Sequence, residues 1–524
     1  MLNAVGFTLY FVLLSATPFL WLLRQIAKVV RGRQGRGPST YAQYWRNSLG
    51  NQFAVSRSVH RPTSREALVE IVRAAAGQRV RAVGSGHSFT DCAVADEIRL
   101  DMHGLNRPLD VDRDRKRVRV EAGMTIRELN QWLAGLKLAL PNMGSYDVQT
   151  ISGAISTATH GSGIAFGSLA DLVRAAELVL DDGHVVHVQP KSGTEEPPSY
   201  AQAIRDDAAF QSVVVAMGSM GIIYAFTLEV RDAFALRETC ELVEWTEVVA
   251  RLGQGVLREH EHWEVLVNPY LTGKSERWCL VTTRNTDHSG AGLAGPRVRH
   301  TAAAIVTGVP IFDQVILWLL GHFPSQTPRL IKSSLGSLVD KSFVSASYDV
   351  FNLGNANLVP AFSSELGFPL ESTHDGVAPF LQAADRLFEL ADQAARHGRW
   401  HTVPISLRFV RGSPHYLSPQ HGRDTCMIEI PMLLGAKSGW DLLQYYERRL
   451  LPMGARPHWG QANWFVGAEN VRTLYSDFPA WLSALKRFNP RGTFDGPFTD
   501  RLGVSVRRAA AQGKSRAAED STVA

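Results

Sequence analysis

RAVGSGHSFTD, residues 81–91, and TISGAISTATHGSG, residues 150–163, are the two stretches that decide the fold of this chain. The first follows a helical pattern at 66–76 and a short apolar strand at 80–83, and it turns at 84–86, where glycine reaches a positive φ at little cost. The second stretch shares its small, hydroxyl-rich composition. Because successive backbone N–H groups in such turns bind anions, the pair predicts a grip on the two phosphates of a dinucleotide.

Each of these stretches also has an ordinary interpretation. Neither matches the dinucleotide pattern GxGxxG or the phosphate-binding pattern GxxxxGK[ST], and each alone is typical of a plain strand-to-helix turn. A lone histidine such as His87 is typically a loop residue satisfied by hydrogen bonds. The two stretches in this order, with His87 between Gly86 and Ser88, favour a ligand-binding interpretation instead.

A long, ordered series of further motifs accompanies the two turns: LPNMGS at 140–145, MGSMGII at 217–223, LRFVRG at 407–412, LSPQHGRDT at 417–425, RPHWG at 456–460 and FNPRGTFDG at 488–496. With these motifs the chain resembles the FAD-linked oxidases of the vanillyl-alcohol oxidase superfamily, and within it the sugar-1,4-lactone oxidases and the alditol oxidases. The resemblance runs from about residue 44 to residue 503.

The resemblance implies an α+β protein of two domains, a PCMH-type FAD-binding domain and a substrate (cap) domain built on an antiparallel sheet. Strands alternate with helices over 53–230, and a β-hairpin is predicted within 176–188, as the first domain requires. We expect this organisation: a transmembrane or membrane-anchor helix at 1–24, a basic linker at 25–43, the FAD-binding domain at 44–232, the cap domain at 233–504 and a disordered tail at 505–524.

Composition excludes several other classes of protein. A chain of 524 residues with 45% hydrophobic residues suffices for two cores. The net charge of +5 comes without a concentrated basic face in the body, which argues against a nucleic-acid partner. The four cysteines lie far apart with no CxxC, which argues against a zinc site and a disulfide scaffold and fits a cytoplasm-facing location. No metal-ligand cluster stands out, so we expect no metal.

The N-terminus favours a membrane anchor. Residues 1–23 carry no charged side chain, and Arg24, Lys28 and Arg31 follow them. About 20 apolar residues suffice to cross a bilayer, and the positive-inside rule then keeps the catalytic body in the cytoplasm. An interfacial helix and a cleaved signal peptide are the alternatives, although a signal peptide normally carries its basic residues before the apolar run.

A second apolar segment, 302–320, lies inside the expected cap domain and carries one charge, Asp313. A buried helix of the cap is the simpler interpretation. The lactone oxidases of animals resemble this chain in having an apolar insertion here, so a monotopic membrane contact is the alternative hypothesis.

The resemblance assigns roles to three residues. Oxidation of an alcohol by a flavin moves a hydride to the flavin N5 and needs positive charge near N1 together with an acceptor for the hydroxyl proton. His87 is implied to bond covalently to the flavin 8α carbon. Arg408 matches the arginine that faces the N1 region, where a permanently charged guanidinium suits a developing anion, although an ordinary salt bridge is the alternative. Ser145 matches a serine beside the substrate, and Gly144 leaves little bulk where oxygen approaches N5.

The chain departs from the family pattern at three positions. Ser406 stands where these oxidases carry a glutamate, Gln461 where their tryptophan motif commonly ends in lysine, and Pro431 where alditol oxidases have a threonine. Two opposite charges are therefore absent from the expected pocket, and their joint loss keeps it balanced. His458 and Trp459 are implied to lie over the isoalloxazine, with cap-domain packing as the alternative.

The catalytic set is thus Arg408, Ser145, His458, Gln461 and Ser406. The remaining motifs imply the residues that hold FAD: Gly84, Ser85, Gly86, His87, Ser88, Phe89, Ser145, Thr150, Gly153, Thr157, Thr159, His160, Gly161 and Ile222.

The leading functional hypothesis is an FAD-dependent oxidase that acts on a CH–OH group of a sugar-1,4-lactone, like the arabinonolactone and gulonolactone oxidases, or of a related polyol, with oxygen as acceptor. One alternative is a membrane dehydrogenase that passes electrons to a quinone or acts on a lipid-linked sugar. Another is a catalytically degenerate flavin-binding membrane protein, which the absent glutamate and lysine suggest. The three altered positions leave the exact substrate open.

Overall fold

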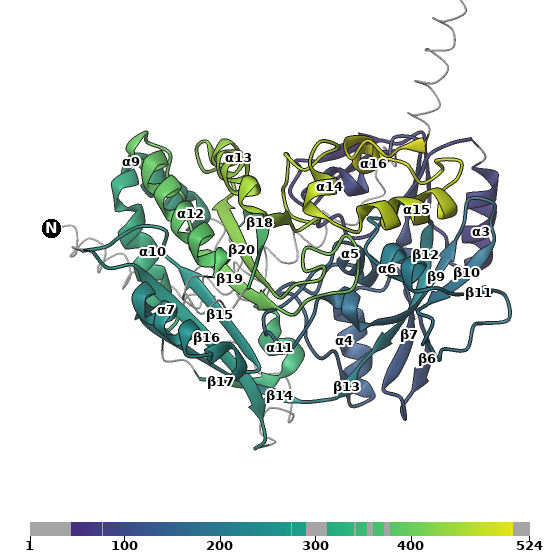
Figure 1. The fold of residues 1–524 in the computed structure, drawn as a ribbon, viewed down its shortest axis with the longest axis horizontal. Helices are drawn as coiled ribbons and strands as arrows, with labels where there is room; N and C mark the ends of the chain where they lie inside the picture. The colour runs from purple at the N-terminus through teal and green to yellow at the C-terminus, as the bar shows by residue number, and fades with distance from the viewer. Residues whose placement is uncertain are drawn as a thin grey trace, which may run out of the picture.

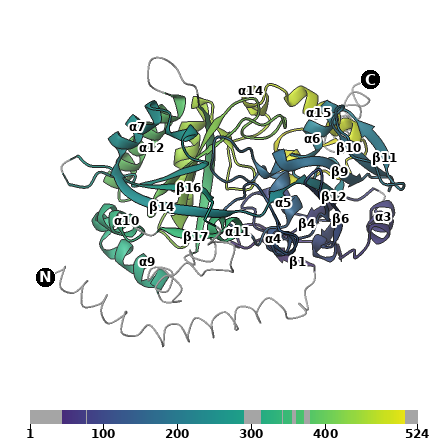
Figure 2. The ribbon, with the colours of Figure 1, turned by 90° about the horizontal axis from the view of Figure 1, so that it is seen from below.

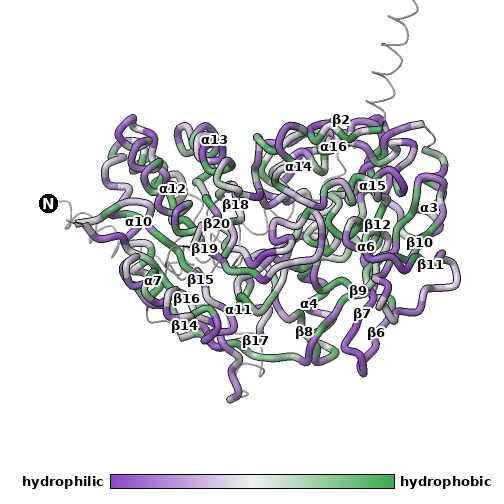
Figure 3. Tube along the Cα trace, in the orientation of Figure 1, coloured by the Kyte–Doolittle hydropathy of each residue, from purple (hydrophilic) through white to green (hydrophobic). Residues whose placement is uncertain are grey.

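Two sheet-based halves lie side by side in the computed structural model of this chain (Figure 1). The structure describes residues 43–75, 77–273, 275–289, 312–339, 342–353, 360–370 and 378–506. Apolar residues gather along central elements of both halves, such as β9, β12 and β15, whose bounds are given below (Figure 3). The architecture confirms the expected two-domain arrangement.

The first half is built on two main sheets. A parallel three-stranded sheet has the order β3 (Ser58–His60), β5 (Ile98–Asp101) and β4 (Val80–Val83). A six-stranded sheet has the order β11 (Gln202–Arg205), β10 (Val185–Gln189), β9 (Val173–Val179), β12 (Ile222–Glu229), β7 (Arg117–Glu121) and β6 (Pro108–Asp112). Strands β9 and β10 form the predicted antiparallel hairpin.

Local signals explain the helices that bring the glycine-rich turns into place. Helix α3 (Arg65–Ala74) starts at Ser64, whose side chain accepts the Ala67 N–H, and it buries Leu68 and Val72 before the chain enters β4. Helix α4 (Ile126–Gly135) starts with a capping box of Thr125 and Glu128. The short helix α5 (Ile151–Ser156) begins directly after Thr150 and lies within the second glycine-rich stretch.

The second half is an eight-stranded sheet whose paired strands are all antiparallel, as expected for the cap. Its order is β17 (Phe343–Ala346), β14 (Ala235–Glu244), β16 (Trp278–Asp287), β15 (His262–Val267), β19 (Ile405–Val410), β20 (Thr425–Leu433), β18 (Ala361–Pro369) and β21 (Arg456–Pro457).

Period-two alternation gives this sheet two different faces. One face carries apolar residues such as Val265, Leu407 and Ile428, which are fully buried. Helices pack on the outer side of the sheet: α7 (Trp245–Gly253), α10 (Thr327–Gly336), α12 (Pro379–Arg396) and α13 (Gly439–Leu450) (Figure 1). The other face carries polar residues such as Glu264 and Arg408, which are cross-strand partners.

The last described helices return to the first half. Helix α15 (Phe478–Phe488) packs on α6 (Asp207–Val213). In α16 (Pro497–Arg501), Arg501 pairs with Asp91 at 3.0 Å, while Asp500 of the same helix pairs with Arg79 at 2.9 Å. These contacts hold the preceding segment, with its tryptophan motif, between the two halves. The boundaries 44–232 and 233–504 stay predictions.

The expected anchor at 1–24 lies outside the described residues, as do nearly all of the linker at 25–43 and the tail at 505–524. Among the helices that the structure describes, none combines the length and the apolar character needed to cross a bilayer. Of the insertion 302–320, only the part from residue 312 is described, as helix α9 (Phe312–His322) at the periphery of the second half (Figure 2). Trp318 of α9 is 54% exposed, so this part is not the buried helix of the simpler interpretation.

Candidate active site

Three loops from distant parts of the sequence converge between the two halves: 84–90, 142–163 and 457–461. The Phe89 N–H donates to the Gly460 carbonyl at 2.8 Å, and Thr90 Oγ1 donates to the Trp459 carbonyl at 2.8 Å. These bonds join the first glycine-rich turn to the tryptophan motif and so place both beside the second glycine-rich stretch.

The first turn has the form of an anion-binding nest. In the described part of the chain, the backbone N–H groups of residues 84–88 donate no hydrogen bond to another group, although Phe89 does. Gly86 has φ +65° and thus needs glycine, and a Cβ on Gly84 would lie 2.0 Å from Thr150 Oγ1. Ser85 Oγ donates to the Val148 carbonyl at 2.6 Å and orders the turn. Unpaired N–H groups in a bend that contains two glycines fit a dinucleotide pyrophosphate.

The second stretch is built just as tightly. Thr157 Oγ1 donates to the Gly153 carbonyl at 3.0 Å and lies 3.4 Å from Thr159 Oγ1. A Cβ on Gly161 would lie 2.3 Å from Asn142 Oδ1, and one on Gly144 would lie 2.9 Å from Thr159 Cγ2. The loop around 142–145 therefore packs directly on the second stretch, and both glycines are required by that packing.

His87 lies at the edge of this region. Burial lowers the pKa of its imidazole, so the ring is neutral at pH 7. Its ring centroid lies 5.8 Å from that of Tyr146. The neighbouring Ser88 Oγ lies 3.0 Å from Cys92 Sγ and 3.1 Å from Thr90 Oγ1. A neutral ring nitrogen retains the lone pair that a covalent bond to carbon requires.

Arg408 is the centre of the polar face of the large sheet. Its Nε donates to Glu264 Oε1 at 3.0 Å, its Nη1 lies 3.1 Å from Glu429 Oε2, and its Nη2 donates to Ser145 Oγ at 3.2 Å. Although burial disfavours the charged form, the two carboxylates outweigh it and raise the pKa of Arg408. The structure thus brings Arg408 and Ser145 together, as predicted. Arg408 also forms salt bridges, which was the alternative interpretation of this residue.

A row of alternating charges crosses the sheet through Arg408. Glu238 on β14 accepts from Arg284 on β16 at 2.7 Å, and Arg284 donates to Glu264 at 3.0 Å. Burial alone would raise the pKa of Glu264, but Arg408 and Arg284 together lower it to about 2. Glu264 is therefore a permanent anion that holds Arg408 in place.

His160, Glu365 and His458 form a second buried group, whose ligating atoms lie within 4.8 Å of one another. His160 Nδ1 donates to the Gly161 carbonyl at 2.9 Å, and its Nε2 lies 3.4 Å from Glu365 Oε1. His458 Nδ1 accepts the Gly460 N–H at 3.0 Å, which leaves its proton on Nε2. A metal ion would need a lone pair on Nε2 of His458, but that atom carries the proton. The geometry therefore favours an ion pair of His160 and Glu365 over a metal site.

The two positions that depart from the family pattern are bonded to this network. Ser406 Oγ donates to Glu264 Oε1 at 3.3 Å. Gln461 Oε1 accepts from Ser363 Oγ at 2.6 Å, and Ser363 also lies 3.1 Å from Glu429 Oε1. The site thus contains carboxyl groups despite the missing glutamate. Neighbouring strands supply these acidic groups, and the balance expected from the joint loss of two charges stays a prediction.

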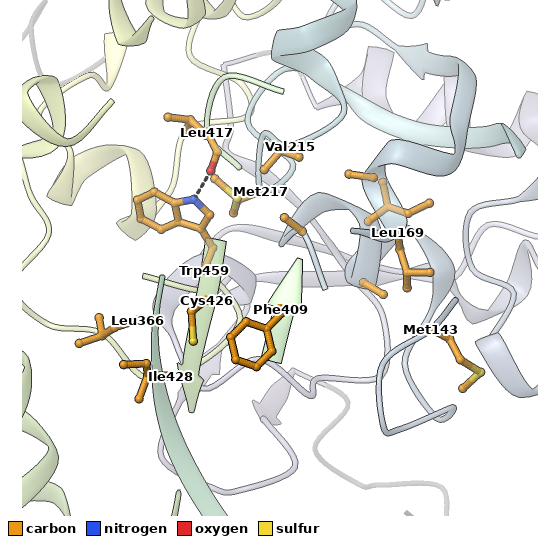
Figure 4. Packing of buried hydrophobic residues seen from close by; sticks show 14 of the residues in the cluster. Met143, Leu169, Val215, Met217, Leu366, Phe409, Leu417, Cys426, Ile428 and Trp459 are labelled. Carbon is orange, nitrogen blue, oxygen red and sulfur yellow. Dashed lines mark hydrogen bonds between the residues drawn. The ribbon is translucent and has the colours of Figure 1, made fainter. Parts of the chain in front are cut away.

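Ile222 of the predicted FAD-binding set lies in the core, and so does Trp459, which the resemblance implied to lie over the isoalloxazine. Ile222, the first residue of β12, is fully buried in the core of the first half. Trp459 is buried, and its Nε1 donates to the Leu417 carbonyl at 2.6 Å (Figure 4). Its ring also stacks on Tyr475. These contacts support the packing interpretation for Trp459, while His458 faces the second stretch.

Glu264, Glu365, Glu429 and Tyr146 were missed in the sequence. Each of the three glutamates is a single carboxylate within a strand of largely apolar residues, as in TCMIEIPML at 425–433. Charged residues are almost never fully buried without a partner, so this isolation was a usable signal. The partner on a neighbouring strand, however, is not visible in the sequence.

Comparisons with known proteins agree with the fold and the site. A family model described as an FAD binding domain matches residues 56–189, and one for D-arabinono-1,4-lactone oxidase matches residues 226–502. The L-gulono-1,4-lactone dehydrogenase of Mycobacterium tuberculosis is 28% identical over 477 residues, which cover 87% of this chain and 98% of the relative. The alditol oxidase of a Streptomyces species is 27% identical over 470 residues, covering 86% and 97%.

The crystal structure of cholesterol oxidase from B. sterolicum shares the fold. It has a TM-score of 0.70 at 14% identity and covers 89% of this chain and 99% of that chain. The predicted resemblance, the two-domain PCMH-type fold and the FAD cofactor are confirmed by these matches.

Proposed function

This chain belongs to the D-arabinono-1,4-lactone oxidase family of FAD-dependent oxidoreductases, and on that premise we propose that it oxidises a CH–OH group of a sugar-1,4-lactone or a related polyol. The observation that carries the proposal is the contact of Arg408 with both Ser145 and Glu429 beside the two glycine-rich stretches. It places a fixed cation, a hydroxyl and a carboxyl group within reach of one substrate.

The residues present fit FAD. The N–H groups of residues 84–88 would hold the pyrophosphate, and the second stretch with Ser145 and His160 would line the ring. Bound FAD supplies the hydride acceptor, which the side chains of the protein cannot replace. The chain itself must orient the substrate hydroxyl and accept its proton.

The charges of the site favour a neutral substrate. Arg408 is already paired with two carboxylates, and Gln461 provides no cation. A sugar acid would bring a further negative charge toward Glu365 and Glu429, at a cost that rises in a buried setting. A lactone or a polyol offers hydroxyl groups that Ser145 and Gln461 can bind. We therefore propose neutral lactones and polyols rather than their open-chain acids.

We further propose that His87 bonds covalently to the flavin. Its place directly after Gly86 in the first turn and its neutral ring support this role. The test is a denaturing gel of the purified holoenzyme, in which the wild-type protein band should fluoresce under ultraviolet light and the band of His87→Ala should not. Free flavin released from the wild-type protein by acid would contradict the tether.

Oxygen is the proposed electron acceptor, and a dehydrogenase that reduces another carrier is a second candidate. Gly144 lacks the bulk that would block oxygen from the flavin. Its packing on Thr159, however, is a separate reason for a glycine at this position. The relative from Mycobacterium tuberculosis, named a dehydrogenase, also favours the second candidate. Stopped-flow reoxidation of the reduced enzyme by oxygen and by a soluble quinone decides between them.

We propose that residues 1–24 anchor the enzyme in a membrane, with the catalytic body on the cytoplasmic side. The uncharged run before Arg24 supports this, and the exposed Trp318 and Phe323 of α9 and its flank support an additional contact with lipid. Fractionation of a variant that lacks residues 1–36 tests both ideas. Release into the soluble fraction supports the anchor alone, and retention that is lost on Trp318→Ser supports the contact.

An anaerobic screen of flavin bleaching tests the proposed activity directly. Neutral sugar lactones and alditols should bleach the flavin absorbance, and the corresponding aldonic acids should not. Lipid-linked sugars are the informative third class because of the proposed anchor. If no compound of these classes reduces the flavin, the degenerate flavin-binding protein becomes the better description.

A further inference from the structure

Three carboxyl groups lie around Arg408, and they differ in how firmly they are held. Glu264 is bound by two guanidinium groups and by Ser406. Glu365 faces the imidazole of His160. Within the described part of the chain, Glu429 has one guanidinium contact, to Arg408, and one hydroxyl contact, to Ser363. Its side chain is 17% exposed, against 7% for Glu264 and 2% for Glu365, so it is the most accessible of the three.

The surroundings also separate the three groups by acidity. Burial raises the pKa of Glu429, Arg408 lowers it only in part, and the neighbouring carboxylate of Glu365 raises it further, so the net shift is upward. For Glu365, burial is outweighed by His160, and the pKa falls to about 2. The pKa of Glu264 falls to a similar value. When carboxyl groups in one site have different pKa values, those with a low pKa remain anions, and one with a raised pKa can carry a proton.

We infer that Glu429 is the catalytic base of the reaction proposed above: it accepts the proton of the substrate hydroxyl while the carbon loses its hydride. The O–H bond of the substrate breaks and an O–H bond forms on Glu429, the C–H bond breaks with its electron pair passing to the oxidised flavin, and the carbinol becomes a carbonyl. Atoms and electrons therefore balance with FAD as the only co-reactant. This inference rests on the proposed function.

The hydrogen bonds around Glu429 fit this role. Its Oε2 contacts Arg408, which also contacts Ser145, so a hydroxyl bound at Ser145 lies near the carboxyl group. Its Oε1 contacts Ser363, and Ser363 contacts Gln461 from the third loop. Ser363 has one proton to donate, which makes it a positioning residue whose bond can shift between Glu429 and Gln461.

The sheet offers a specific way to test the role. Ser406 on β19 and Glu429 on β20 are direct cross-strand partners, so their side chains lie on the same face. A carboxylate introduced at 406 therefore enters the same site from the adjacent strand. Glu241 on β14 is an exposed glutamate of the same sheet and serves as the matched control.

The experiment compares Glu429→Gln, the double variant Ser406→Glu/Glu429→Gln and Glu241→Gln as folded holoenzymes. We expect Glu429→Gln to slow flavin reduction by about 10²–10⁴-fold, the usual contribution of a general base. Substrate affinity from spectral titration should change only a few-fold. The double variant should recover at least part of the rate, and Glu241→Gln should match the wild type.

Two further readouts separate catalysis from structure. A base must be ionised, so the wild-type rate should rise with pH through the raised pKa of Glu429, and this rise should vanish in Glu429→Gln. Without any substrate, the infrared signal of protonated carboxyl groups should titrate in the wild type and in Glu241→Gln. Glu429→Gln should lose only the component that Glu429 contributes, because other buried carboxyl groups remain, such as Glu447, whose pKa burial raises to about 7.

A Glu429→Gln rate within about three-fold of the wild type would overturn the inference, because a general base contributes far more than that. An infrared titration of Glu429→Gln that is identical to that of the wild type would overturn it as well. If the wild type oxidises none of the screened substrates, the proposed function fails, and the base inference fails with it. A wild type that is active but unaffected by Glu429→Gln rejects the base inference alone.

Discussion

His160 Nε2 and Glu365 Oε1 face each other at 3.4 Å, and neither atom has another hydrogen-bond partner within the described part of the chain. The Nδ1 of His160 already donates to the Gly161 carbonyl. If the imidazole were neutral and the carboxylate ionised, both facing atoms would be hydrogen-bond acceptors. Two acceptors cannot face each other stably, so one proton lies between them. Contact with His160 lowers the pKa of Glu365 despite its burial, so Glu365 is the anion of this pair.

This pair predicts a large difference between two variants of Glu365. Glu365→Ala leaves His160 without its partner, and breaking a buried ion pair costs about 3–5 kcal/mol of unfolding free energy. Glu365→Gln should cost far less, because an amide N–H can donate to neutral His160. Urea unfolding at pH 7 measures both. Equal and small losses would show that the pair is not ionised.

The same pair predicts how stability depends on pH. The folded-state pKa of Glu365, about 2, lies below the ordinary value of 4.5. The contribution of the carboxylate is therefore fully present above pH 4.5 and is lost as pH falls toward 2. The unfolding free energy of Glu365→Gln should fall less steeply than that of the wild type over this range.

Buried neutral histidines predict a second loss of stability in acid, which begins at a higher pH than the loss due to Glu365. Burial lowers the pKa of His262 to about 4 and that of His401 to about 3, so the unfolded state binds protons first as pH falls. Stability is retained above about pH 6.5 and declines below it, by about 1.4 kcal/mol per pH unit for each such group. His401→Leu should flatten this slope between pH 6.5 and 4, and the exposed His184→Gln should not.

The first glycine-rich turn predicts a selective loss of cofactor. Gly84→Ala places a methyl group 2.0 Å from Thr150 Oγ1, which the turn cannot accommodate without moving. We expect the purified variant to contain little FAD, measured by absorbance against protein. Gly135→Ala in α4 is the matched control, since its Cβ would meet nothing within 4 Å. Full FAD loading of Gly84→Ala would reject the nest as the cofactor grip.

The contacts of Arg408 predict that a positive charge at this position does not by itself sustain catalysis. Lysine keeps the charge but presents one compact ammonium instead of three directed contacts. Arg408→Lys should therefore lower kcat/KM by about 10²-fold, the effect of a displacement near 1 Å at a reacting centre. FAD content and the unfolding midpoint should change little in comparison. A variant with wild-type kcat/KM would show that the bridge to Ser145 and Glu429 is dispensable.

Much of the site was predictable from sequence because it depends on local backbone chemistry. The glycines at 84, 86 and 161 are required by close approach or by a positive φ, and such requirements leave their mark on neighbouring residues. The hairpin of β9 and β10 and the helix α4 likewise follow from turn and capping residues adjacent in sequence. These features identified the cofactor and the family.

The charge pattern of the site was not predictable in this way. Four adjacent strands of the sheet supply the charged residues Glu264, Arg408, Glu429 and Glu365: β15, β19, β20 and β18. Of these, β15 and β18 are far from the other two in the chain. Cross-strand pairing places Glu429 opposite Ser406, where the family pattern had suggested only a lost carboxylate.

The sequence by itself therefore determined the cofactor, the order of the two halves and the family. Those features follow from backbone conformations that adjacent residues impose. Only the tertiary structure decided which acids surround Arg408 and whether Trp459 lines the site or fills the core. Such contacts depend on sheet register between distant segments, which is fixed by burial of one apolar face and not by any local motif.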